Sequence, residues 1–304
     1  MVYDGLKLNL GQIENIAREI NRQNAIPIVH AESDKLLNEN RKKLVKDNLL
    51  EPQYQPVLRD KEVEIKAVRN IIDIARKNKL RFYFVHISTS GAGELIKKAR
   101  YDGVKIMGET CPQYLVLDKN IYVKKDCVFY LASPPLRDEK DQSALWKLLS
   151  ENALQVVSTD HCPFTIREKL TGSKDLLNVP NGLPGIETTL RLIYTYGVKK
   201  KNISIERMVY LLSHNPSRIF AMGSVKGFIK EGYDADLVIF NSKTESVIEN
   251  SMDKSSVFNP YAGFKLFGSA DLVLSRGEIV SKNGIFTGDF SHGRFVKRSG
   301  GIDI

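Results

Sequence analysis

Polar side chains that suit metal binding or acid–base chemistry follow several short apolar runs of this chain. His30 stands in Val-His-Ala-Glu, His86 in Val-His-Ile-Ser and Asp160 in Ser-Thr-Asp-His, and Glu109 holds a similar position. Neutral imidazoles and carboxylates together suit zinc or a similar divalent ion. One histidine after an apolar run is more often structural. Here three such residues each follow an apolar run, and this shared position favours a metal or acid–base site.

The apolar runs alternate with amphipathic segments. Strands are predicted at about 25–30, 81–87, 104–109 and 154–160, and helices at 60–79, 91–100, 142–151 and 205–222. This alternation indicates parallel strands joined by right-handed crossovers, so the polar residues gather at one edge of the sheet. A (β/α)₈ barrel carries its active site there, and so does an open doubly wound sheet. No GxGxxG follows a strand, so dinucleotide binding is unsupported.

The sequence pattern changes after about residue 223. Short β runs are predicted at 227–229 and 236–240, and residues 272–280 predict a hairpin that turns at Arg276-Gly277. Further turns are expected near Asn283-Gly284 and Gly288-Asp289. This part of the chain therefore predicts a small β appendage.

The composition favours a globular protein of the cytoplasm. The 304 residues carry a formal net charge of +9, but the basic residues are spread out and no zinc finger or RNA-binding aromatic motif accompanies them. A solvated basic surface is therefore expected, without nucleic acid as a partner. No apolar run approaches the ~20 residues that span a bilayer, and no secretory pattern is visible, so neither a membrane nor an export role is expected.

Six short motifs occur in this chain in the same order as in one family of enzymes. They are VHAES at 29–33, HISTSGAGELI at 86–96, GETCPQYL at 108–115, ASPPLR at 132–137, STDHCPF at 158–164 and NGLPGIE at 181–187. Together they resemble the dihydropyrimidinase/hydantoinase branch of the amidohydrolase superfamily. The run KGFIKEGYDADLVIFN at 226–241 resembles the C-terminal segment with which chains of that superfamily lead from the barrel back into a β-sandwich. Dihydroorotases and allantoinases share two of the runs and remain an alternative.

The resemblance implies a distorted TIM-type (β/α)₈ barrel with a binuclear metal centre, for which zinc is the expected ion. His30 and His86 match the metal ligands of the fifth and sixth barrel strands, and Asp160 matches that of the eighth. In this family a metal-bound hydroxide opens a cyclic amide at its ring carbonyl. Asp160 would also be catalytic, passing the proton to the leaving nitrogen.

The same resemblance implies three substrate contacts. Tyr3 would donate its hydroxyl to the developing oxyanion, which also makes it a catalytic residue. Ser133 and Asn181 would hold the cyclic amide through backbone groups. The expected function is therefore a cyclic amidohydrolase that acts on a small cyclic amide or imide.

The chain departs from the family in two respects: it contains no HxH motif, and it has no lysine at the position that bridges the two metals. We therefore expect an N-terminally truncated member. Residues 1–222 would be barrel strands five to eight, and residues 223–304 a portion of the β-sandwich and a tail. Activity of the chain alone is expected to be impaired. The alternatives are half of a split enzyme that needs a complementing N-terminal half, and a non-catalytic dihydropyrimidinase-like assembly protein. A homo-oligomer is also expected.

Overall fold

The computed structural model describes residues 6–249 and 256–298, which form two compact units. Unit 1 comprises Met1–Glu187 and Asn250–Ala262, and unit 2 comprises Thr188–Glu249 and Gly263–Ile304. The chain is an α/β protein with one four-stranded parallel sheet and one four-stranded antiparallel sheet. These units are defined by packing, and the predicted domain boundary after residue 222 stays a prediction.

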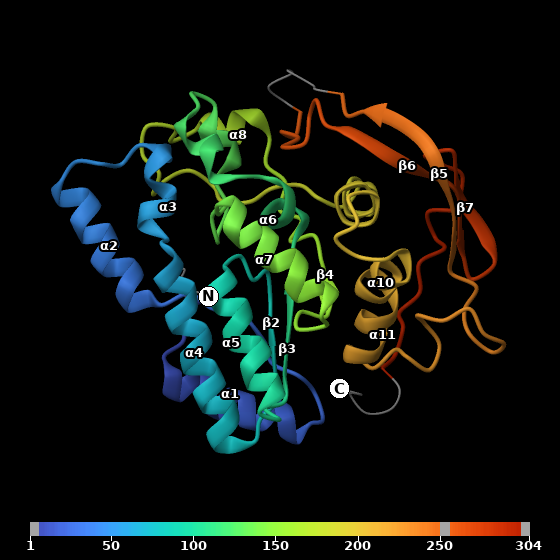
Figure 1. The fold of residues 1–304 in the computed structure, drawn as a ribbon, viewed down its shortest axis with the longest axis horizontal. Coiled ribbons are helices and arrows are strands. Elements are labelled where there is room, and N and C mark those ends of the chain that lie inside the picture. The colour runs from blue at the N-terminus through green and yellow to red at the C-terminus, as the bar shows by residue number, and fades with distance from the viewer. Residues whose placement is uncertain (1–5, 250–255, 299–304) are drawn as a thin grey trace. The chain divides into compact units, whose positions relative to one another are not determined.

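Unit 1 contains the parallel sheet, in the order β1-β2-β3-β4. Figure 1 labels β2, β3 and β4 of this sheet. Its strands are β1 (Ile28–Val29), β2 (Phe82–Phe84), β3 (Ile106–Thr110) and β4 (Val156–Val157). Every residue of β2, β3 and β4 is buried, as expected for parallel strands that are covered on both faces. The four predicted strands are thus confirmed, but they are shorter than predicted. One reason is that His86 and Asp160 have φ angles of 41° and 46°, which extended strands do not adopt.

The helices of unit 1 begin at side-chain caps. The long helices α4 (Lys61–Asn78), α5 (Ser90–Tyr101) and α7 (Glu139–Ser150) confirm three predicted helices, and α5 packs against the other two. Asp60, Thr89 and Asp138 cap them, each accepting a bond from a first-turn N–H. The remaining helical segments of this unit are α1 (Leu10–Arg22), α2 (Asp34–Lys46), η1 (Pro52–Tyr54), α3 (Gln55–Leu58), α6 (Pro112–Val116), η2 (Lys119–Val123), η3 (Cys127–Tyr130) and α8 (Ile166–Leu170).

Unit 2 contains the antiparallel sheet, in the order β5-β6-β7-β8. Its strands are β5 (Leu237–Val247), β6 (Lys265–Ser275), β7 (Glu278–Lys282) and β8 (Ile285–Phe286). The predicted hairpin at 272–280 is confirmed by the pairing of β6 with β7. The helical segments are α9 (Thr189–Leu192), η4 (Ile193–Lys199), α10 (Ile205–Val209), η5 (Tyr210–His214) and α11 (Asn215–Ile219).

Two predictions for unit 2 differ from the structure. The helix predicted over 205–222 is a succession of segments, because η5 is a turn of π-helix between α10 and α11. The β run predicted at 227–229 is wrong. Gly227 has a φ angle of 86°, and a Cβ there would lie 2.1 Å from Oγ of Ser217, so the chain turns closely past the helix end. Among the described helices, none is long and apolar enough to cross a membrane.

Candidate functional site

The carboxyl ends of β1 and β2 bring His30 and His86 together. His30 directly follows β1, His86 lies two residues beyond β2, and these strands pair in parallel. Nδ1 of His30 lies 2.8 Å from Nε2 of His86, and the rings meet edge to face. Both side chains are largely buried. Two histidines separated by 56 residues in the chain thus direct ring nitrogens at one point.

The other ring nitrogen of His30 is held by a buried carboxylate. Nε2 of His30 lies 2.7 Å from Oε2 of Glu32, and the Arg59 guanidinium donates to the same oxygen. Burial alone would raise the pKa of Glu32, but the charges of Arg59 and the two histidines lower it to about 2. A carboxylate that fixes the distal nitrogen of an imidazole orients the ring and makes it a better metal ligand.

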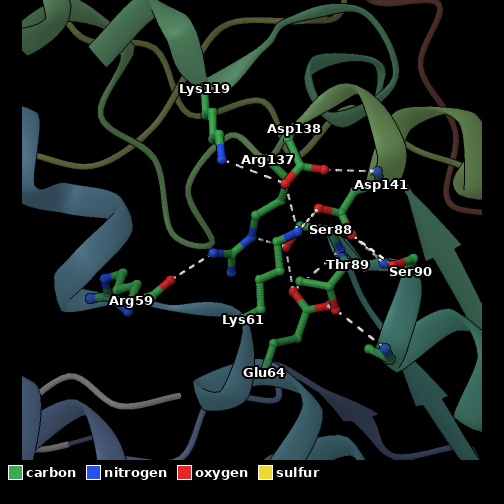
Figure 2. Close-up of polar contacts among 11 residues, drawn as sticks. Arg59, Lys61, Glu64, Ser88, Thr89, Ser90, Lys119, Arg137, Asp138 and Asp141 are labelled. Carbon is green, nitrogen blue, oxygen red and sulfur yellow. Dashed lines mark hydrogen bonds and ion pairs between the residues drawn. The ribbon is translucent and has the colours of Figure 1, made fainter. Parts of the chain in front are cut away.

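The loop that carries His86 is fixed by Glu64 of α4 (Figure 2). Glu64 is 2% exposed, and its carboxylate accepts bonds from the backbone N–H and the hydroxyl of both Ser88 and Thr89. Nε of Arg137 donates to Oγ of Ser88 at 3.0 Å. The residues just after His86 are therefore held by four hydrogen bonds to one carboxylate.

The network in Figure 2 continues in two directions. The Arg137 guanidinium also donates to the carbonyl of Arg59 at 2.7 Å, which connects it to the residue that pairs with Glu32. Asp141 of α7 accepts bonds from both the N–H and the hydroxyl of Ser90 at 2.8 Å, and Lys61 lies 2.7 Å from Asp141. Both histidines are thereby supported by one set of buried polar contacts.

The electrostatics around His86 favour a neutral imidazole. Burial, followed by the charge of His30, lowers the pKa of His86 to about 3. A neutral ring nitrogen keeps the lone pair that a metal ligand donates. Two nitrogens bound to one tetrahedral zinc at about 2.0–2.1 Å would lie about 3.3 Å apart, so the two rings would reach that separation with a shift of about half an ångström from the hydrogen-bonded distance observed here. The pair therefore fits part of the ligand shell of one divalent ion.

Asp160 lies beyond β4 and is influenced by a second acid. Burial of its carboxyl group, and then the charge of Glu109, raise the pKa of Asp160 to about 6. Glu109, on β3, is buried and accepts hydrogen bonds from the hydroxyls of Tyr83 and Ser158. Within residues 6–249 and 256–298, no three His, Cys, Asp or Glu side chains are grouped closely enough to hold a metal ion. The structure thus pairs His30 with His86 but does not group Asp160 with them as a third ligand.

The predicted substrate contacts lie on two loops of unit 1. The side chain of Asn181 accepts from Nε2 of Gln55 at 2.6 Å and donates to the carbonyl of Val179. Oγ of Ser133 is buried, and no hydrogen-bond partner is found for it in the described part of the chain. Tyr3 lies outside the described residues.

His161 supports the second of these loops. Its Nδ1 accepts hydrogen bonds from the N–H groups of Gly185 and Ile186, at 3.1 and 3.4 Å. The sequence motifs alone gave no role to Glu32, although Glu32 lies two residues from His30 in the VHAES run.

Known proteins resemble this chain in sequence and in fold. The model of the amidohydrolase family matches residues 6–280. A D-phenylhydantoinase of Escherichia coli is 35% identical over 295 residues, which cover 96% of this chain and 64% of that protein. A solved D-hydantoinase from a Bacillus species matches with a TM-score of 0.93 at 33% identity, covering 98% of this chain and 67% of that one. A dihydropyrimidinase from Brevibacillus agri matches with a TM-score of 0.93 at 34% identity, covering 97% and 65%.

The chain belongs to the amidohydrolase family. Its relatives within that family include D-hydantoinases and a dihydropyrimidinase, whose structures match 97–98% of this chain and so include both of its sheets. The chain spans 64% of the length of the curated relatives it matches.

Proposed function

We propose that this chain carries one part of the active site of a hydrolase that opens cyclic amides of the hydantoin or dihydropyrimidine type. One observation carries the proposal: Nδ1 of His30 and Nε2 of His86 converge to 2.8 Å at the carboxyl ends of adjacent parallel strands. Active sites of barrel enzymes are built at that end of the strands. The relatives whose names are hydantoinase or dihydropyrimidinase match both sheets of the chain.

The residues have separate roles in this reaction. His30 and His86 would hold a divalent ion, most simply zinc, which supplies Lewis-acid chemistry to a water and to the ring carbonyl. Asp160 would accept a proton from the attacking water and pass it to the leaving ring nitrogen. Backbone groups of Ser133 and Asn181 would hold the ring, and Tyr3 would donate to the developing oxyanion.

We infer that β1 to β4 correspond to strands five to eight of a (β/α)₈ barrel, and that the antiparallel sheet corresponds to a portion of the β-sandwich. In the described part of the chain, β1 is an edge strand that pairs only with β2. A hollow of about 710 Å³ lies beside it and is lined in part by Leu8, Ile13, Val29 and His30. An open parallel edge with an apolar hollow suits a further strand.

The chain has no HxH motif and no lysine at the bridging position, so we propose that its own activity is impaired. The missing ligands would come from a complementing N-terminal half, whose strands would pair with the edge of β1. The proposed partners of this chain are therefore a small cyclic amide or imide and either a complementing N-terminal half or further copies of the chain.

The experiment is a ring-opening assay of the zinc-loaded chain, with and without a complementing segment. The segment is the part of the Escherichia coli relative that this chain does not span, produced together with the full chain. Hydantoin, dihydrouracil, allantoin and dihydroorotate are the substrates. We expect opening of hydantoin or dihydrouracil only in the complemented sample, and its loss with His86→Ala.

Three results would contradict parts of this proposal. Strong turnover by the chain alone would contradict an incomplete site. Turnover of allantoin or dihydroorotate, without turnover of hydantoin or dihydrouracil, would assign the activity to the neighbouring branches of the superfamily. A stable complex that binds zinc but opens none of the four rings would favour a non-catalytic assembly protein.

A further inference from the structure

Two loops of unit 1 are joined by the side chain of Gln55. Nε2 of Gln55 donates to the carbonyl of Ala132 at 2.9 Å and to Oδ1 of Asn181 at 2.6 Å. Gln55 is only 1% exposed. Both of its partners are acceptors, so the orientation of the Gln55 amide is fixed by the contacts themselves. Gln55 therefore links the 131–134 loop to the 179–182 loop from inside the protein.

Lys169 links the same two loops at a second point. Its Nζ donates to the carbonyl of Leu131 at 2.9 Å and to that of Pro180 at 2.8 Å. Lys169 is 1% exposed, and it lies 5.3 Å from the ring centroid of Phe164. The loops also meet directly, because the N–H of Gly182 donates to the carbonyl of Leu131 at 2.9 Å.

These contacts hold the loops together without a strand pairing between them. Two buried side chains satisfy four acceptors, two on each loop. Losing Gln55 would leave the Ala132 carbonyl and Oδ1 of Asn181 without these donors, and losing Lys169 would leave the Pro180 carbonyl without one, at about 1–3 kcal/mol for each group left unpaired. Burial lowers the pKa of Lys169 to about 7, but a neutral amine still has two N–H donors for its two carbonyls. The link therefore does not depend on the charge of Lys169.

The two loops are the ones that carry Ser133 and Asn181. The side chain of Asn181 is hydrogen-bonded to Gln55 and to the carbonyl of Val179. Asn181 would therefore bind a ligand through its main chain. The carbonyl of Asn181 has a long contact of 3.9 Å with the thiol of Cys162. Oγ of Ser133 and Oε1 of Gln55 are buried, and no partner for either is found in the described part of the chain. Unpaired polar atoms on the 131–134 loop and on the linking residue Gln55 indicate a place for a polar ligand.

We propose that Gln55 and Lys169 are positioning residues that set the separation of the 131–134 and 179–182 loops, and that this separation selects the size of the cyclic amide ring. The inference rests on the proposed function, because it assumes that the two loops bind the ring. Hydantoins have five-membered rings and dihydropyrimidines have six-membered rings. A change of a few tenths of an ångström between the loops would favour one over the other.

The test compares the full-length, zinc-loaded chain with Gln55→Met and Lys169→Met. Methionine keeps the length of each side chain and removes its donors. Gln142→Met is the matched control, because Gln142 also donates to a backbone carbonyl, that of Leu117 at 2.6 Å, away from these loops. Two quantities are measured: deuterium exchange in peptides that contain Gly182, and calorimetric affinities for hydantoin and dihydrouracil.

We expect exchange at Gly182 to become about tenfold faster in both test variants, as loss of ~1.4 kcal/mol of local stability would produce. The affinity for the preferred ring should fall about tenfold, and the ratio of the two affinities should change at least about threefold. Gln142→Met should change neither quantity.

Unchanged exchange at Gly182 would overturn the proposed link between the loops. Faster exchange with unchanged affinities would show that the link serves stability alone, and would overturn the positioning role. In both cases the wild-type chain still binds a ring, so the proposed function stands. A wild-type chain that binds neither ring, even when it is assembled with the complementing segment, would instead contradict the proposed function, and this inference with it.

Discussion

The two sheets of this protein use polar residues in opposite ways. In unit 1, β2 and β3 are buried along their whole length, and the polar groups at the strand ends lie in a buried network around Glu64 and Arg137. In unit 2, none of the eleven residues of β5 is buried, and charged pairs such as Lys265–Glu245 are exposed. All the candidate site residues that the structure describes belong to unit 1. The difference teaches that a charge should matter greatly for folding in unit 1 and little in unit 2.

The largest expected effect is that of Glu64→Ala. This change removes the acceptor of two backbone N–H groups and two hydroxyls, all buried. We expect the free energy of unfolding of unit 1 to fall by about 3–5 kcal/mol. Urea unfolding followed by the fluorescence of Trp146, the single tryptophan and a buried one, measures it.

The matched control is Glu245→Ala in unit 2. Glu245 lies 3.0 Å from Lys265, and both side chains are half exposed. Exposed pairs of this kind contribute about 0–1 kcal/mol, so the thermal midpoint of unit 2 should hardly change. Equal losses for Glu64→Ala and Glu245→Ala would contradict the contrast between the two regions.

The second expected effect would show where unit 2 is tightly packed. Gly268 and Gly277 both have a φ angle of 83°, so alanine is strained at either position. A Cβ at Gly268 would lie 2.1 Å from the ring of Phe240, whereas nothing lies within 4 Å of a Cβ at Gly277. We expect Gly268→Ala to destabilise unit 2 by about 1–3 kcal/mol more than Gly277→Ala. Scanning calorimetry measures the stability of both variants. Equal losses of stability would mean that the contact with Phe240 does not contribute to the destabilisation.

The third expected effect is a dependence of stability on pH that comes from Lys169. Burial lowers the pKa of its ammonium group from 10.5 to about 7, against a smaller opposing effect of Cys162. Between these values the unfolded chain holds a proton that the folded chain has released. The free energy of unfolding therefore rises with pH in this window, by up to ~1.4 kcal/mol per pH unit.

Lys169→Met removes this titration. The difference in the free energy of unfolding between wild type and variant should therefore change by up to ~1.4 kcal/mol per pH unit from about pH 8 to about pH 10. Below pH 7 both states are protonated and the difference should be constant. Urea unfolding followed at Trp146 gives the values. A pH-independent difference throughout would show that Lys169 titrates normally in the folded state.

Much of the fold could be predicted because its signals are local. Apolar runs marked the four parallel strands, and amphipathic spacing marked α4, α5 and α7. β5 was predicted only at 236–240, since its second half, Asn241–Val247, is polar and exposed and lacks an apolar pattern. The π-turn η5 was missed because a single turn with wider hydrogen bonds inside a helical stretch leaves no local pattern in the sequence.

The site was predictable to a smaller extent. His30 and His86 could be found because each follows an apolar run, and parallel topology brings such ends together. The contacts of Glu64 with Ser88 and of Arg137 with Ser88 join residues 24 and 49 positions apart. No local pattern in the sequence marks such pairs, so their roles became visible only from the packing of α4 against the loop after β2.

The most direct test of the central claim is calorimetric titration of the metal-free, full-length chain with zinc. We predict one ion per chain, with an affinity that falls at least about tenfold in His30→Ala and in His86→Ala and is unchanged in His292→Ala. His292 is a suitable control because it lies in unit 2. Zinc affinities of His30→Ala and His86→Ala equal to that of the wild type would contradict the assignment of this histidine pair as a metal site.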